Sequence, residues 1–134
     1  MEERLAYLRA QLASAIADFD GSLRVQPEDF PPNVADLIRN GQVQKFEFTI
    51  ELFWKTAKAF ILEVHGFDLA SPKPVIKKYF ELGYVDYTAC DRLIRALEIR
   101  NSLSHVYKQV TFLELYTEIA RLEGFLAAAA AGMA

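Results

Sequence analysis

The stretch FEFTIELFWKTAKAFILEVHG, residues 46–66, decides the fold of this chain. Its apolar side chains recur at alternating steps of four and three residues: Phe46, Ile50, Phe53, Ala57, Phe60 and Val64. This period predicts an amphipathic helix, and Gly66 after His65 marks its C-terminal end. Further apolar residues lie off that stripe, so we expect a central helix that is buried on more than one side: Phe48, Leu52, Trp54 and Ile61.

Upstream of this stretch, Pro31-Pro32-Asn33 is a helix-start signal with Asn33 as the N-cap. Asn40-Gly41 interrupts the run, which leaves two alternatives, one long helix with a weak point or two consecutive helices. Closer to the N-terminus, apolar spacing predicts a first helix over about Glu2–Phe19, ended by Asp20-Gly21. The proline-containing stretch that follows, Asp20–Pro32, is expected to be a loop.

Three shorter helices are predicted downstream. Ser71 opens one that Gly83 ends, and Asp86 caps the next. Thr111 and Glu114 form a capping box, which predicts the start of a last helix that continues to Leu126. Without strand-like alternation, repeats or a linker, the sequence predicts one all-α domain over residues 1–134, an up-and-down bundle of four to five helices.

Composition excludes several classes of protein. Of the 134 residues 52% are hydrophobic, and the formal net charge is -3. So apolar a chain is not disordered, and its charge excludes binding to nucleic acid by bulk positive charge alone. The apolar fraction is slightly above the usual range, which points to surface that a partner covers. The lone Cys90 favours a reducing compartment, and no apolar run is long enough to span a membrane, so we expect a cytoplasmic protein.

Most signatures of catalysis are missing. The sequence contains no glycine-rich phosphate loop and no G-x-S-x-G motif. Two histidines are too few for a multi-histidine metal centre in one chain, so we expect neither a metal nor a cofactor. His65 fits a helix C-terminus, where cations are favoured. Cys90 and Trp54 are interpreted as core residues, and a solvated helix row with one ion pair is expected from Glu47, Glu51 and Lys55.

The segment RNSLSHVY, residues 100–107, is the exception. Arginine offers a fork of donors to a phosphate, histidine titrates near neutrality, and asparagine and tyrosine add hydrogen bonds, which together suit phosphodiester chemistry. On an ideal helix, at about 100° per residue, His105 points about 140° away from Arg100. A tightened or broken last turn, or a symmetric dimer, would have to bring the two together. The alternative is a polar helix end at which His105 caps carbonyls and Arg100 is solvated.

Lysine and arginine residues also cluster locally despite the acidic net charge. The acidic excess lies within residues 1–32, whereas Ser71–Phe80 and Ile99–Leu113 contain bases and no acids. If these two segments meet in the fold, they provide a place for one RNA phosphate. The candidate phosphate-binding residues are Lys77, Lys78 and Lys108, with Lys73 on the same segment as the first two.

Two motifs resemble a known family. Arg100-x4-His105-x-Tyr107 matches the R-x4-H-x-Y signature of HEPN domains, and residues 44–55, QKFEFTIELFWK, resemble the nucleotidyltransferase substrate-binding branch of that superfamily. The resemblance extends over about residues 44–122. It implies a five-helix bundle that forms a homodimer with both R-x4-H motifs at a shared cleft. It also implies a partner, a minimal nucleotidyltransferase encoded by the adjacent gene.

In the HepT-like toxin members of that family, the HEPN protein is a ribonuclease, and its partner is the antitoxin, which transfers AMP to the tyrosine of the motif. The resemblance implies a metal-independent endoribonuclease in which His105 assists attack of the ribose 2′-hydroxyl on the adjacent phosphorus of RNA. Arg100 would hold the phosphate, Asn101 would orient the pair, and Tyr107 would accept AMP. The alternative is a non-catalytic subunit that binds substrate for, or docks on, the nucleotidyltransferase. A third alternative is a bundle whose fourth helix simply ends there.

Overall fold

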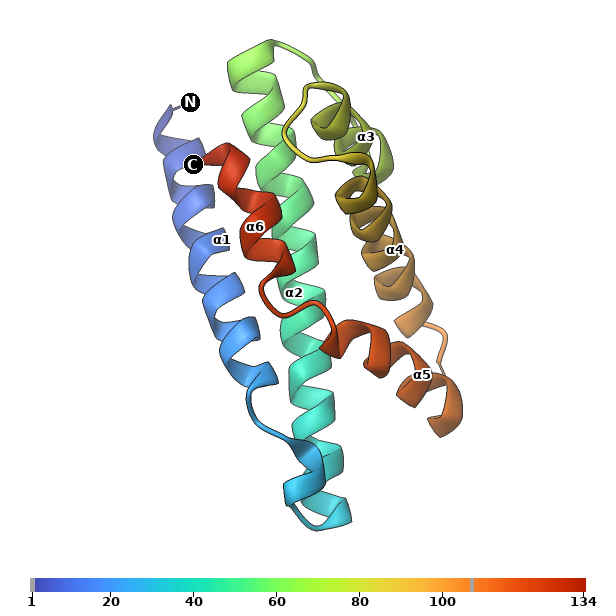
Figure 1. The fold of residues 1–134 in the computed structure, drawn as a ribbon. Helices are drawn as coiled ribbons and strands as arrows, with labels where there is room; N and C mark the ends of the chain where they lie inside the picture. Colours follow the sequence, from blue (N-terminus) through green and yellow to red (C-terminus); the bar gives the residue numbers. More distant parts are fainter. Residues whose placement is uncertain (1, 107) are drawn as a thin grey trace.

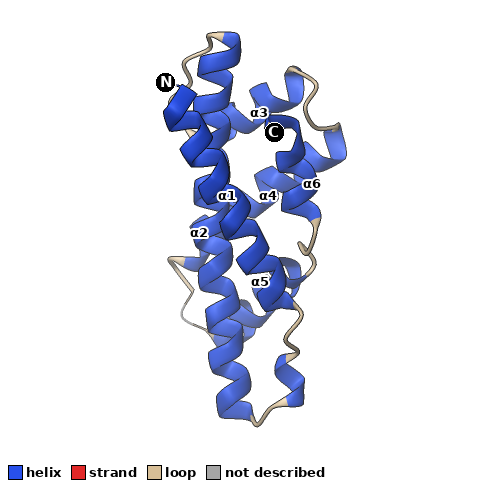
Figure 2. Ribbon diagram, turned by 90° about the vertical axis from the view of Figure 1, so that its left-hand side faces the viewer, coloured by secondary structure: helices blue, strands red, loops and turns tan. Residues whose placement is uncertain are grey.

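The computed structural model describes residues 2–106 and 108–134, and over these residues the chain is helical and contains no strand (Figures 1 and 2). The all-α prediction is confirmed. In chain order, the elements are α1 (Glu2–Leu23), the 3-10 turn η1 (Pro27–Asp29), α2 (Pro32–His65), α3 (Pro72–Glu81), α4 (Tyr87–Leu103), α5 (Gln109–Ala120), α6 (Phe125–Ala130) and the 3-10 turn η2 (Ala131–Met133). None of the helices in the described ranges is long and apolar enough to cross a membrane.

The central element is α2, a single helix of 34 residues that passes through Asn40-Gly41 without a break. Its predicted stripe is buried up to Phe60, and Phe46, Ile50, Phe53 and Ala57 are fully inaccessible. The prediction is wrong for the last member, Val64, which is 53% exposed because it lies at the end of the helix. The helix ends where expected, since Gly66 adopts φ 78° and donates its N–H to the carbonyl of Leu62 at 2.9 Å. This left-handed backbone conformation suits glycine, which has no Cβ to clash.

The other helices surround α2 (Figure 1). On one side, α1 runs along it and α6 packs against α1, and on the other side α3 and α4 form a second pair. The short helix α5 follows α4 and contacts both α2 and α4. The connection after Gly66 returns along α2, since Lys58 pairs with Asp68 (Nζ to Oδ1, 3.5 Å). The N-terminus of α3 lies beside the middle of α2 and the C-terminal end of α4, since Pro72 lines one cavity together with Trp54 and Arg100.

Several predicted helix boundaries are confirmed. Asp86 caps α4, its Oδ1 accepting the N–H of Ala89 at 2.8 Å, and Ser71 is the N-cap residue of α3. The predicted start of α2 is wrong by two residues. Asn33 as N-cap implies a first helical residue at position 34, whereas α2 begins at Pro32 with Pro31 as N-cap. Proline suits that position, where its missing N–H has no intrahelical partner to lose.

Two further predicted boundaries are wrong. The first helix does not stop at Phe19 but continues through Gly21 to Leu23, because both Phe19 and Leu23 are buried in the core and their packing outweighs the cost of a helical glycine. The last helix begins at Gln109 with Lys108 as N-cap, so Thr111 lies inside it and is no cap.

The predicted last helix is also two helices. It breaks between Ala120 and Phe125, where Gly124 has φ 79° and donates its N–H to Oδ1 of Asp20 at 3.2 Å. This break brings α6 back over α1, which a continuous helix could not do, and buries Leu126 completely.

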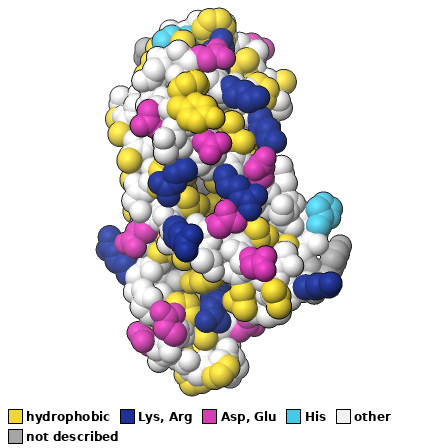
Figure 3. Space-filling view, turned by 45° about the vertical axis from the view of Figure 1, so that its right-hand side comes forward, with side chains coloured by type: hydrophobic (Ala, Val, Ile, Leu, Met, Phe, Trp, Pro, Cys, Tyr) yellow, Lys and Arg dark blue, Asp and Glu magenta, His cyan; other side chains and the backbone are white. Residues whose placement is uncertain are grey.

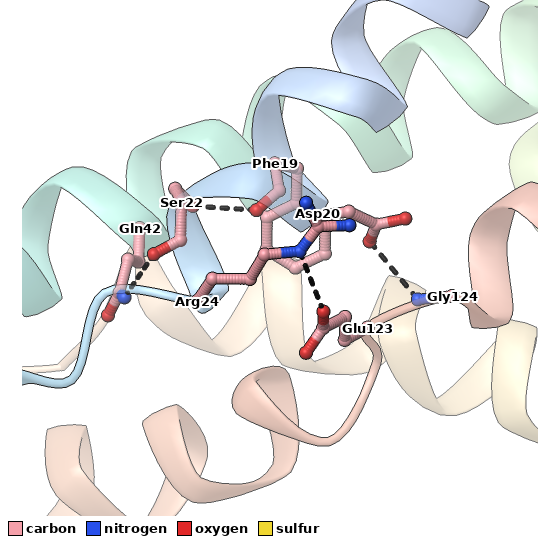
Figure 4. A network of polar contacts seen from close by, with 7 residues as sticks. All are labelled: Phe19, Asp20, Ser22, Arg24, Gln42, Glu123 and Gly124. Atoms are coloured by element: carbon pink, nitrogen blue, oxygen red, sulfur yellow. Dashed lines mark hydrogen bonds and ion pairs between the residues drawn. The ribbon is translucent and has the colours of Figure 1, made fainter.

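A polar network joins the end of α1 to α2 and to the turn before α6 (Figure 4). Gln42 of α2 is 2% exposed, and its amide nitrogen donates to the carbonyls of Ser22 at 2.8 Å and Val25 at 3.1 Å. On the solvent side, Arg24 pairs with Glu123 at 3.4 Å, beside the contact between Asp20 and Gly124. Buried amides need such partners, since an unpaired polar group in a core is costly.

Candidate functional site

The C-terminal end of α4 has a tightened last turn. The helix ends at Leu103, the hydroxyl of Ser104 donates to the carbonyl of Asn101 at 3.0 Å, and the N–H of His105 donates to the carbonyl of Ser102 at 3.0 Å. The last contact spans three residues, as in a 3-10 turn. A turn of this kind was one of the two ways in which Arg100 and His105 were expected to come together. Asn101 and His105 are exposed, and Tyr107 lies outside the described residues.

Arg100, in the last turn of α4, is directed towards α2. Its Nε lies 3.1 Å from Oε2 of Glu51, with the two side chains 36% and 30% exposed. Nε is buried and the angle is not that of a hydrogen bond, so the contact is an ion pair. Glu51 also pairs with Lys55 at 3.3 Å, which confirms the expected i,i+4 pair. In the part of the chain that the structure describes, no hydrogen bond joins Arg100 to His105.

The carboxylates of α2 set the charge around Arg100. The pKa of Glu51 is lowered: burial acts to raise it, but Trp54, Lys55 and the Arg100 guanidinium together outweigh burial. One turn earlier, burial raises the pKa of Glu47, with the charge of Arg100 acting in the opposite direction. Glu51 is therefore ionised at neutral pH and offsets much of the charge of Arg100. No pattern in the sequence indicated this pairing, because spacing along the chain does not say which turn of α2 faces α4.

A cavity of about 390 Å³ lies beside Arg100, where the N-terminus of α3 meets α2 and the end of α4. It is lined by Glu51, Trp54, Ser71, Pro72, Lys73, Pro74, Leu97, Arg100 and Asn101. The two basic segments of the sequence thus meet here. Acidic residues meet them as well, since Lys73 pairs with Glu98 at 3.6 Å, so the region is mixed in charge and not basic. Basic and acidic side chains alternate over the side that carries α3 to α5 (Figure 3).

The three lysines predicted to bind phosphate do not line the cavity beside Arg100. Lys78 pairs with Glu81 at 3.0 Å and its ammonium lies 4.4 Å from the centre of the Phe67 ring. Lys77 is close enough to Cys90, near the N-terminus of α4, to act on its pKa. Both therefore lie further along α3 than Lys73 and do not line the cavity beside Arg100. Lys108 lines a different hollow of about 330 Å³, together with Glu47.

The remaining candidates are Cys90, His65 and Trp54. Cys90 is buried, and burial raises the pKa of its thiol. His65, at the end of α2, lies 2.7 Å from the hydroxyl of Tyr84. Trp54 packs against the core but is only partly buried, and it forms one wall of the cavity beside Arg100. Among the described residues, no group of three or more metal-binding side chains comes together.

Comparison with known proteins gives one family and one fold. A family model described as "nucleotidyltransferase substrate binding protein like" matches residues 9–131. A crystal structure of a protein from Thermus thermophilus is similar with a TM-score of 0.79 and 23% identity, covering 91% of this chain and 98% of the other. At that identity the likeness shows the fold. No curated protein matches the sequence.

Proposed function

Because this chain belongs to the nucleotidyltransferase substrate-binding protein-like family, we propose that it is the helical partner of a nucleotidyltransferase and that the end of α4 is a metal-independent ribonuclease site. The single observation that supports the ribonuclease is the tightened turn after Leu103. It presents Asn101 and His105 to solvent on the same helix end that carries Arg100.

The chemistry needs few groups. His105 takes the proton of a ribose 2′-hydroxyl while the 2′-oxygen bonds to the adjacent phosphorus. The bond from phosphorus to the 5′-oxygen breaks, and the 5′-oxygen takes up a proton from water. The products are a 2′,3′-cyclic phosphate and a 5′-hydroxyl end. Arg100 stabilises the charge that develops on the phosphoryl oxygens, and Asn101 orients the substrate. No metal is required for this step.

A homodimer completes the proposed site. Within one chain Arg100 faces Glu51 and the exposed His105 lies beyond the helix end. A second copy with the same helix end at a shared cleft would supply a histidine opposite each arginine. Exposed apolar residues near the helix end, Val110 at 68% and Leu113 at 37%, suit burial against such a copy.

The partner would control the toxin by transferring AMP to Tyr107. The added phosphate carries negative charge close in sequence to Arg100 and His105, where it would compete with the RNA phosphate. Mass spectrometry of the protein co-expressed with its nucleotidyltransferase should find the AMP on Tyr107. A modification at another residue would refute this assignment.

The test of the ribonuclease uses the two histidines of the chain as a matched pair. His105→Ala should abolish RNA cleavage and relieve growth arrest while the purified protein keeps its helical content and oligomeric state. His65→Ala, at the far end of α2 and bonded to Tyr84, is the control and should cleave as the unmodified protein does. Equal cleavage by the His105→Ala variant would exclude His105 from the reaction.

The second candidate is a non-catalytic docking subunit. It is favoured by the Arg100–Glu51 ion pair, which offsets the charge that a phosphate site needs. In that case purified protein leaves RNA intact, and His105→Ala instead weakens co-purification with the nucleotidyltransferase or alters its activity.

A further inference from the structure

We propose that the cavity beside Arg100 holds one nucleotide of a single-stranded RNA, with the base against Trp54 and a phosphate between Arg100 and Lys73. This rests on the proposed ribonuclease and adds to it a base-binding subsite next to the cleavage chemistry. The cavity has about 390 Å³, within the usual range for a site that encloses a small ligand.

The wall of the cavity suits a flat ring. Trp54 is partly exposed into it, and Pro72, Pro74 and Leu97 complete an apolar lining. A tryptophan that was only a core residue would be covered on both faces, whereas this one forms part of a cavity. Bases of single-stranded RNA stack on such aromatic side chains, because every base has a flat π-face.

The charged side of the cavity suits a phosphate. Arg100 lies against Glu51 through its Nε. The two terminal nitrogens of the same guanidinium are the donors that would bind an anion. Lys73 contributes a second cation. Its ion pair with Glu98 is weak, because the two side chains are 3.6 Å apart and about half exposed. Glu51 is then a positioning residue that holds Arg100 at the cavity.

The first turn of α3 explains why the phosphate belongs on these side chains. Helix N-termini often bind anions through free backbone N–H groups, but Pro72 and Pro74 have none. Their rings instead add apolar surface. The cavity therefore separates an apolar part, for a base, from a charged part in which Arg100 and Lys73 are the cations. Asn101, which is exposed, also lines the cavity and can meet polar groups of the nucleotide.

The experiment uses Trp54 as its own probe, because it is the only tryptophan in the chain. The full-length His105→Ala protein, which cannot cleave under the proposed function, is titrated with a single-stranded oligouridylate, with UMP and with an RNA duplex of the same length. We expect saturable quenching of Trp54 fluorescence by the oligonucleotide, with a Kd at least about tenfold lower than for UMP or the duplex. An unchanged emission overturns the proposal, and equally tight binding of UMP overturns the assignment to RNA.

Variants test separately the contribution of the aromatic wall, Trp54, and that of the cation Lys73 to RNA binding. With labelled oligouridylate and anisotropy as the readout, Trp54→Leu should weaken binding about tenfold or more, and Trp54→Phe, which keeps an aromatic face, should recover most of it. Lys73→Gln should weaken binding and reduce its salt dependence. Lys58→Gln is the control, since it removes a lysine one turn along α2 that pairs with Asp68. Equal losses in Lys58→Gln and Lys73→Gln, or no loss in Trp54→Leu, overturn the proposal.

The two proposals fail in different ways. If the unmodified protein cleaves RNA and Trp54→Leu leaves KM and kcat unchanged, the base-binding subsite is wrong and the ribonuclease stands. If the unmodified protein leaves RNA intact while the oligonucleotide still quenches Trp54 and Lys73→Gln prevents it, the ribonuclease is wrong and the subsite stands.

Discussion

Replacing Gln42 by leucine tests the polar network that joins α1, α2 and α5. The side chain is 2% exposed and makes three hydrogen bonds: its amide nitrogen donates to the carbonyls of Ser22 and Val25, and its oxygen accepts the hydroxyl of Tyr116 at 2.6 Å. Leucine has a similar volume and no polar atoms, so it removes all three while filling the same space.

The expected loss follows from these contacts. At about 1 kcal/mol for each hydrogen bond the network contributes about 3 kcal/mol, of which the extra apolar area of leucine returns about 1 kcal/mol. The free energy of unfolding should therefore fall by about 2 kcal/mol. For a chain of 134 residues this corresponds to a decrease in Tm of about 7 °C.

The measurement is urea unfolding followed by circular dichroism at pH 7, with the exposed residue Gln44 as control. Gln44→Leu lies on the same helix and should change the free energy of unfolding by less than about 0.5 kcal/mol. Tyr116→Phe should cost less in the Gln42→Leu background than alone, because it then breaks no bond. If Gln42→Leu is no more destabilising than Gln44→Leu, the network is not a source of stability.

Two further predictions concern stability. The pKa of Glu118 is lowered by its hydrogen bonds from Arg95, at 2.9 and 2.7 Å, so the pair stabilises the fold above the ordinary carboxyl pKa and loses that contribution as the pH falls below it. Glu118→Gln should cost about 0.5–1 kcal/mol at pH 7 and nothing at about pH 3, and a loss independent of pH in acid unfolding curves would contradict the pair. Gly66→Ala forces alanine into φ 78° and should lower the free energy of unfolding by about 1 kcal/mol, whereas Gly41→Ala, in mid-helix with no atom within 4 Å of the new Cβ, should raise it by about 0.5–1 kcal/mol. Changes of the same sign at both glycines in thermal unfolding would refute this account.

The part of the fold that could be predicted from sequence is the part that local chemistry controls. The apolar stripe from Phe46 places α2, and Gly66 and Asp86 end and begin helices through their own backbone and side-chain bonds. The errors come from packing at a distance. Gly21 stays helical because Leu23 is buried beyond it, and the sequence around Thr111 has a valid capping pattern that the structure does not use.

In the candidate site, too, residues close in sequence could be predicted, whereas contacts between helices could not. The resemblance supplied Arg100, Asn101, His105 and Tyr107 from their spacing, and the last turn of α4 is tightened, but the side chain of Arg100 pairs with Glu51. The pairing of Arg100 with Glu51 was missed, because an i,i+4 row on α2 indicates only that Glu51 and Lys55 can meet each other. The signal that was available is Trp54, three residues from Glu51, whose aromatic side chain showed that this face of α2 is not fully solvated.

The break at Gly124 also constrains the order in which the chain can fold as it is synthesised. The bond between Asp20 and Gly124 joins residues 104 positions apart, and Leu126 and Met133, 0% and 1% exposed, complete the core beyond it. A nascent chain can pair α1 with α2 early, but the apolar surface that α6 covers stays open until residues 125–133 have left the ribosome. Closing so long a loop is slow compared with local helix pairing, and during that interval the exposed face is a substrate for chaperones or a nucleus for aggregation.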